Sequence, residues 1–174
     1  HREMAACMDI KDIYEHPVTT HWSTDFHVIN DAIADLEALD ALTTDAYAGS
    51  THKIIQLIEG SARYAKRKDK PMIITEFGGS PYGDSIGDLT KQVHLGNWKG
   101  FFCQMAVTPM LWWFAFVDEQ DLYGHYRAIR NFVEGEDMRG MNSDAQIIPG
   151  ANIRLHTLHS NNRVFIWGYD RGHY

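Results

Sequence analysis

Short apolar, β-branched runs alternate with segments of helical periodicity along most of this 174-residue chain. Runs of the first kind lie at residues 18–22, 41–47, 71–79 and 108–116. Segments with apolar residues at helical spacing lie at residues 2–14, 30–39, 50–70, 89–107 and 122–134. Strands that alternate with helices predict parallel βα units joined by right-handed crossovers. Four such units make half of a (β/α)8 barrel.

The chain is shorter than a complete barrel of this kind, which typically takes about 250 residues. We therefore expect an α/β fold in which residues 1–137 form half of a TIM barrel. Residues 138–150 are rich in Asp, Asn, Ser, Gly and Pro and predict a linker. Two β-rich runs flank Ser160-Asn161-Asn162, so residues 151–174 predict the first hairpin of a small all-β domain.

Composition excludes several classes of function. The formal net charge is −7, which disfavours a nucleic-acid partner. No apolar run approaches the roughly 18 residues of a membrane span. The ten histidines lack metal-ligand spacing, and no glycine-rich nucleotide-binding motif occurs. We therefore expect no metal, no cofactor, no nucleic acid and no membrane span.

Glu76 is the sharpest candidate for chemistry. It follows the apolar run Met72-Ile73-Ile74, where a buried parallel strand ends, and two glycines follow at Gly78 and Gly79. In a barrel, the carboxyl ends of the strands form the active site. The alternative from position alone is a carboxylate in a surface loop or an ion pair.

Polar and aromatic residues also end the other predicted strands. The candidates for substrate binding are His21, Trp22, Asp45, Trp112, Trp113 and Asp118, and Tyr47 ends the second predicted strand in the same way. A tryptophan at a strand end suits a sugar subsite because sugar rings stack on aromatic faces. Several of these candidates have a structural alternative. His21 could be a structural histidine, Trp112 and Trp113 could lie in the core, and Asp118 to Asp121 could form a polar turn.

The order of these motifs resembles the cellulase-like retaining glycoside hydrolases of the (β/α)8-barrel clan, of the family 5 type. The resemblance covers about residues 2–137 and rests on three pieces of sequence. They are Arg2-Glu3-Met4-Ala5-Ala6 with His16-Pro17-Val18-Thr19-Thr20, the run from Pro71 to Gly78, and the run from Trp112-Trp113 to Asp121-Leu122-Tyr123. It implies that the four units are strands five to eight. It also implies that Glu76 is the nucleophile, that Tyr47 orients it by a hydrogen bond, and that Trp112 or Trp113 lines the subsite.

One departure from the family pattern matters. The clan carries its acid/base on a glutamate after strand four, usually in an Asn-Glu pair, and no such pair occurs here. Retaining hydrolysis needs two carboxyl groups. We therefore expect that the chain needs an N-terminal half of the barrel as partner, in the same protein or in a companion chain, and that its substrate is an oligo- or polysaccharide.

Two alternatives stay open. One is a non-catalytic carbohydrate-binding or scaffolding protein with the same barrel. The other is a different barrel enzyme, disfavoured because no Schiff-base lysine or glycine-rich phosphate loop stands at the strand ends. A secreted or periplasmic location is implied by the resemblance alone.

Overall fold

The computed structural model describes residues 1–80 and 82–172 of the chain. Its first sheet is parallel, with the order β1-β2-β3. The strands are β1 (Thr19–Trp22), β2 (Ala41–Tyr47) and β3 (Met72–Gly78). The three runs that predicted these strands and their parallel pairing are confirmed.

Helices of very different length connect and follow these strands. They are α1 (Arg2–Lys11), the 3-10 turn η1 (Phe26–Val28), α2 (Asp31–Ala34), α3 (Thr51–Lys68), α4 (Ile86–Phe102), α5 (Phe114–Glu119) and α6 (Tyr123–Val133). Ser50 caps α3 by accepting a hydrogen bond from the backbone N–H of Lys53, as its type predicts. The helix predicted at residues 30–39 forms only the single turn α2.

The predicted fourth strand at residues 108–116 is wrong except at one position. Leu111 forms a parallel bridge with Phe77, and α5 already begins at Phe114. Pro109 has no N–H to donate to a ladder. Trp113 (φ −78°, ψ 62°) forms an inverse γ-turn, closed by the hydrogen bond from Phe114 N to the Trp112 carbonyl at 2.8 Å. The chain therefore turns away from β3 after one bridge.

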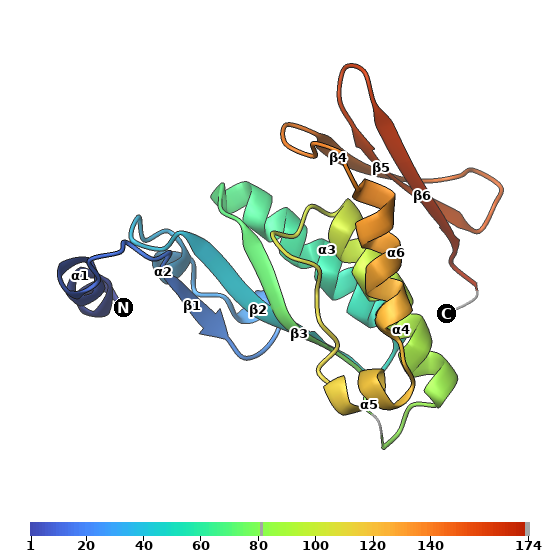
Figure 1. Cartoon of the computed structure of the whole chain (residues 1–174), viewed down its shortest axis with the longest axis horizontal. Helices are drawn as coiled ribbons and strands as arrows, with labels where there is room; N and C mark the ends of the chain where they lie inside the picture. Colours follow the sequence, from blue (N-terminus) through green and yellow to red (C-terminus); the bar gives the residue numbers. More distant parts are fainter. Residues whose placement is uncertain (81, 173–174) are drawn as a thin grey trace.

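The parallel sheet carries α3, α4 and α6 together on one side (Figure 1). The buried core between them is apolar, and its centre is formed by Ala46, Ile54, Ile58, Ile74, Phe77, Val93 and Leu111. A second cluster around Leu42, Tyr64 and Met72 continues this core toward α2. Within residues 1–80 and 82–172, no helix is both long and apolar enough to cross a membrane.

The C-terminal part forms an antiparallel sheet with the order β4-β5-β6. The predicted hairpin is confirmed as β5 (Ile153–His159) and β6 (Val164–Asp170), while His173 and Tyr174 lie outside the described residues. The linker predicted at residues 138–150 is wrong over Asn142–Ile147, which form β4. Its polar composition reflects an edge strand that is mostly exposed, with Ser143 donating a hydrogen bond to the Phe102 carbonyl.

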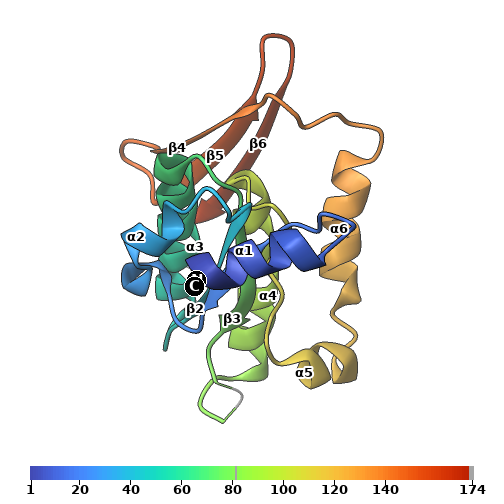
Figure 2. The ribbon, with the colours of Figure 1, turned by 90° about the vertical axis from the view of Figure 1, so that its left-hand side faces the viewer.

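Aromatic side chains attach this second sheet to the helices. Phe102 of α4 stacks on Trp167 of β6 with ring centroids 5.9 Å apart, and Phe132 of α6 contacts Phe165 at 5.5 Å. Figure 2 shows the antiparallel sheet lying across one end of α3 and α4. The two sheets therefore share α4 as a common packing surface.

The contact between α4 and β3 gives a test of this packing. A Cβ on Gly96 would lie 2.6 Å from the ring of Phe77, which is fully buried, so the ring or the helix would have to shift. Gly96→Ala should lower the free energy of unfolding by about 1–3 kcal/mol, measured by urea denaturation.

Gly124 of α6 provides the matched control, because a Cβ there meets nothing within 4 Å. Gly124→Ala should be neutral or stabilising by up to about 1 kcal/mol. Equal stability of the Gly96→Ala protein and the unmodified protein would show that α4 does not pack against Phe77 as described.

Candidate active site

A β-bulge in β3 decides where Glu76 points. Thr44 pairs with Ile74, but the next residue of β2, Asp45, pairs with Glu76, so Thr75 is an extra residue on β3. Ile74 and Phe77 both lie in the helix-side core. The two intervening residues lie on the opposite face, where Thr75 is hydrogen-bonded to Asp45 and Glu76 to Tyr47. A bulge of this kind re-aims a side chain at the end of a strand.

Glu76 receives a hydrogen bond from Tyr47 at the end of β2. The Tyr47 hydroxyl donates to Glu76 Oε2 at 2.7 Å, and both side chains are partly accessible. Burial of the ring, the hydrogen bond to Glu76 and the negative charges of Glu76 and Asp45 raise the pKa of Tyr47 well above its usual value. The phenol therefore stays protonated and remains a donor to the carboxylate.

A second polar network lies beside this pair on the same face. His21 Nε2 lies 2.9 Å from Asp45 Oδ1 and 3.0 Å from Thr75 Oγ1, and Thr75 Oγ1 donates to Asp45 Oδ1 at 2.8 Å. Asp45 is only 2% exposed, whereas His21 is exposed. The buried carboxylate of Asp45 thus holds the accessible imidazole of His21 near the carboxyl end of β1. Sequence reasoning missed Thr75, although a threonine within an apolar run could have signalled a polar face.

The two neighbouring tryptophans have different environments. Leu111 lies in the helix-side core, so alternation places Trp112 on the same face as Glu76, and Trp112 is 43% exposed. Trp113 is partly buried, and its indole Nε1–H donates to the Gly79 carbonyl at 2.8 Å. Trp112 is therefore accessible on the sheet face that also carries Glu76, while Trp113 holds the loop after β3.

The loop after β3 also needs its glycines. Gly78 has φ 143°, a conformation that side chains rarely adopt, and a Cβ there would lie 3.0 Å from Leu111. Gln92 accepts a hydrogen bond from Gly79 N at 2.8 Å and donates to Asp84 Oδ2 at 2.9 Å. Neither Gln92 nor Asp84 was predicted from the sequence. Gln92 and Asp84 together hold the backbone at Gly79, three residues after Glu76.

Two residues predicted to bind substrate lie elsewhere. Trp22 packs against the helix-side cluster of Leu42 and Met72, because alternation along β1 points it away from His21. This packing argues against the predicted contact of Trp22 with substrate. Asp118 lies within α5 and is exposed, and it accepts a hydrogen bond from Tyr123 at 3.0 Å.

Among residues 1–80 and 82–172, no group of three or more His, Cys, Asp or Glu side chains is placed to hold a metal ion. The titratable groups that these hydrogen bonds bring together around Glu76 and Thr75 are His21, Asp45, Tyr47 and Glu76 itself. This set can act as nucleophile, hydrogen-bond donor and polar binding surface.

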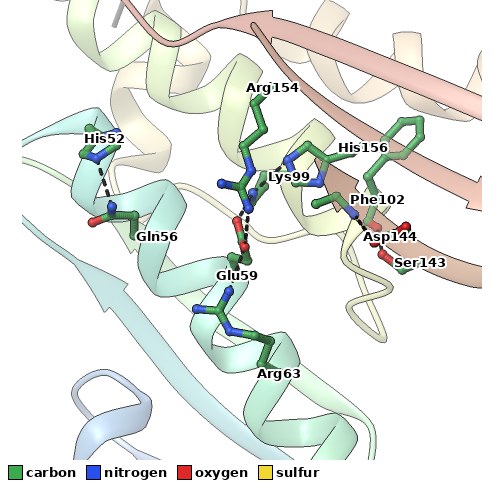
Figure 3. Close-up of polar contacts among 11 residues, drawn as sticks. His52, Gln56, Glu59, Arg63, Lys99, Phe102, Ser143, Asp144, Arg154 and His156 are labelled. Carbon is green, nitrogen blue, oxygen red and sulfur yellow. Dashed lines mark hydrogen bonds and ion pairs between the residues drawn. The ribbon is translucent and has the colours of Figure 1, made fainter. Parts of the chain in front are cut away.

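A second charged cluster, absent from the sequence predictions, lies between α3 and the antiparallel sheet (Figure 3). Glu59 of α3 accepts hydrogen bonds from Lys99, Arg154 and Arg63. Burial alone raises the pKa of Glu59, but these three cations outweigh it and hold that pKa below its usual value. Lys99 is fully buried and lies 3.0 Å from His156 Nε2.

Comparisons with known proteins give one informative match. No protein-family model and no curated protein matches the sequence. Among solved structures, the chain is similar to the endo-β-1,4-mannanase from Thermotoga petrophila, with 14% sequence identity and a TM-score of 0.50. The match covers 97% of this chain and 53% of that one, so the chain spans about half the length of the mannanase. At this identity the likeness shows the fold alone.

The Tyr47–Glu76 contact can be tested by titration. In protein labelled with ¹³C at tyrosine Cζ, the Tyr47 signal should stay that of a neutral phenol well above pH 10, the ordinary tyrosine pKa. Glu76→Gln removes a neighbouring negative charge and should lower the Tyr47 pKa. Glu37→Gln, at an exposed position of the same chain, should leave it unchanged. An unchanged Tyr47 titration in the Glu76→Gln protein would contradict the contact.

The second cluster predicts a dependence of stability on acidity. Burial and the charge of Lys99 lower the pKa of His156 to about 3. Between pH 6.5 and about 3 the unfolded histidine binds a proton that the folded one does not, so the free energy of unfolding falls as pH falls. One such group contributes a slope of about 1.4 kcal/mol per pH unit.

His156→Gln keeps an acceptor for Lys99 and removes this titration. Urea denaturation between pH 6 and pH 4 should therefore give a shallower pH slope than the unmodified protein. His159→Gln, at an exposed position of the same strand, serves as control and should keep the steeper slope. Identical slopes in all three proteins would exclude a buried neutral His156.

Proposed function

We propose that this chain forms the C-terminal half of a retaining glycoside hydrolase barrel and supplies the nucleophile Glu76. In this proposal β1, β2 and β3 are barrel strands five, six and seven, and the segment Met110–Trp112 takes the place of strand eight. The observation that carries the proposal is the position of Glu76. Its carboxylate lies at the carboxyl end of a parallel strand, accepts a hydrogen bond from Tyr47 at 2.7 Å, and lies on the polar face of the sheet.

The chemistry follows from one carboxylate held in this way. An oxygen of Glu76 attacks the anomeric carbon of the sugar, and the bond to the leaving-group oxygen breaks as that oxygen is protonated. Tyr47 orients the attacking carboxylate through its hydrogen bond. Water then hydrolyses the glycosyl-enzyme ester and restores free Glu76. No cofactor enters this sequence of steps.

The residues beside Glu76 suit a sugar. Trp112 offers an accessible aromatic face for the apolar side of a sugar ring. His21, held by Asp45, offers a ring nitrogen to a hydroxyl group. Trp113 acts through the loop it anchors, and Asp118 is a more remote candidate in α5. Because the solved structure similar to this chain is an endo-β-1,4-mannanase, we take β-1,4-mannan as the first substrate to test.

The general acid/base has to come from polypeptide outside this sequence. In retaining enzymes the two carboxyl groups lie about 5–5.5 Å apart. Asp45, on the strand next to Glu76, is not suited to this role. Its carboxylate is buried and hydrogen-bonded to His21 and Thr75. We infer that a partner half of the barrel supplies the acid/base. The barrel half would extend over residues 1–137, and the antiparallel sheet would belong to a separate small domain.

The nucleophile is tested in a protein that contains both halves. Glu76→Gln should lower kcat on β-1,4-mannan by at least about 10⁴-fold, because the covalent step is lost. A 2-fluoro-mannoside with a good leaving group should label the unmodified protein, and peptide mass spectrometry should place the label on Glu76. Tyr47→Phe should reduce kcat by a smaller factor, about 10- to 100-fold, because it removes only the orienting hydrogen bond.

Glu37→Gln again serves as the matched control and should retain full activity. A label on another carboxylate would remove Glu76 from the nucleophile role. Binding of mannan without any turnover or labelling in the unmodified protein would instead favour a carbohydrate-binding protein built on the same fold.

A further inference from the structure

A cavity of about 640 Å³ lies between α3 and the antiparallel sheet, apart from the Glu76 face. The cavity is lined by the C-terminal half of α3, the start of β3, the turn after α4, and strands β4 and β5, and it is partly open to solvent. The volume falls within the roughly 300–1,000 Å³ of small-molecule sites. None of the residues assigned above to hydrolysis lines this cavity.

The walls of the cavity carry an excess of positive charge. Four cationic side chains line it against two carboxylates, and the six residues are Arg63, Lys66, Lys70, Arg154, Glu59 and Asp144. The chain as a whole has a net charge of −7. A cleft lined by an excess of cationic side chains raises the local concentration of anions.

The carboxylate of Glu59 cannot neutralise the cations that surround it. Its Oε1 accepts from Arg63 at 2.7 Å and from Arg154 at 2.5 Å, and its Oε2 accepts from Lys99 at 2.5 Å (Figure 3). The single negative charge of Glu59 is thus shared among three cationic side chains. The second lining carboxylate, Asp144, is exposed and accepts a hydrogen bond from the N–H of Ala145.

Arg154 and Lys66 retain unused donors. The Nε–H of Arg154 is buried and has no hydrogen-bond partner among the residues that the structure describes. Lys66 is exposed at the mouth of the cavity, near the end of α3. A guanidinium pairs well with the planar oxygens of a carboxylate or phosphate group. An oxyanion in the cavity does not reach this buried Nε–H, but it would balance the remaining charge beside the accessible part of Arg154, whose side chain is 23% exposed.

The rest of the lining suits an uncharged group of several atoms. Ala65, Met72 and Met105 line the cavity beside the cations, and the amide side chains of Gln104 and Asn142 also line it. The volume exceeds that of an inorganic anion, whose share of space is comparable to a few water molecules of about 30 Å³ each. The ligand class that fits both parts is a small organic anion of monosaccharide size.

We propose that this cavity binds an acidic monosaccharide, a sugar acid or a sugar phosphate, with its oxyanion facing Arg154 and Lys66. This site is distinct from the proposed hydrolytic site, since none of the residues that line it takes part in the hydrolysis proposed above. A cluster that only attaches the antiparallel sheet to α3 would show no saturable binding.

The proposal is tested by isothermal titration calorimetry on the purified protein, with ionic strength held constant by NaCl. Glucuronate, mannose 6-phosphate, inorganic phosphate and mannose are the four probes. We expect saturable binding of glucuronate or mannose 6-phosphate, and at least about 10-fold weaker binding of inorganic phosphate and of uncharged mannose. The tighter of the two charged sugars identifies the carboxylate or the phosphate as the preferred group.

Two variants assign the binding to this cavity. Lys66→Gln should weaken binding of the preferred anion about 5- to 10-fold, while Lys91→Gln on the exposed surface of α4 should leave it unchanged. Arg154→Lys keeps the charge that pairs with Glu59 and removes the guanidinium fork, so it should also weaken binding. Circular dichroism of each variant confirms that it is folded.

The proposal is overturned if neither charged sugar binds saturably to the unmodified protein. It is equally overturned if inorganic phosphate binds as tightly as the sugar phosphate, or if the Lys66→Gln and Lys91→Gln proteins bind alike. Loss of mannan hydrolysis in the Glu76→Gln protein leaves this test unaffected, because the two sites share no residue.

Discussion

The candidate site depends on one extra residue in β3. If the strand alternated strictly, Glu76 would lie on the same face as Ile74, against the helices. The bulge at Thr75 shifts the register against β2, so that Phe77 takes the core position and Glu76 faces the polar side. A carboxylate on the helix side would be buried among Ile54, Ile58 and Val93 at a high desolvation cost. Apolar burial of Phe77 and exposure of Glu76 therefore support the same register.

The two faces of the parallel sheet have different roles: one is packed against the helices and the other carries the candidate site. One face packs on α3 and α4 through aliphatic and aromatic side chains, and its burial supplies the hydrophobic contribution to folding. The other face carries Thr75, Asp45, His21 and Tyr47, linked to one another or to Glu76 by short hydrogen bonds. Such a polar face is stable only if its groups are paired, which explains why Asp45 has two partners.

Both apolar and ionic contacts join the antiparallel sheet to this unit. Aromatic stacking between Phe102 and Trp167 provides apolar burial, and the Glu59 cluster provides ion pairs across 95 residues of sequence separation. A buried ion-pair cluster contributes little net stability, because removing its charges from water is costly. The cationic excess around Glu59 is therefore better explained by a binding role than by stability alone.

The sequence by itself determined the parallel βα arrangement, the three strands of the first sheet, the β5–β6 hairpin, and Glu76 as the leading candidate at a strand end. These follow from local patterns of apolar and β-branched residues, which depend on neighbours a few positions apart. Tertiary structure alone decided the bulge at Thr75, which face of β1 packs against the helices, and the Glu59 cluster. Each depends on contacts between segments distant in sequence, where packing space and the pairing of buried charges override local preference.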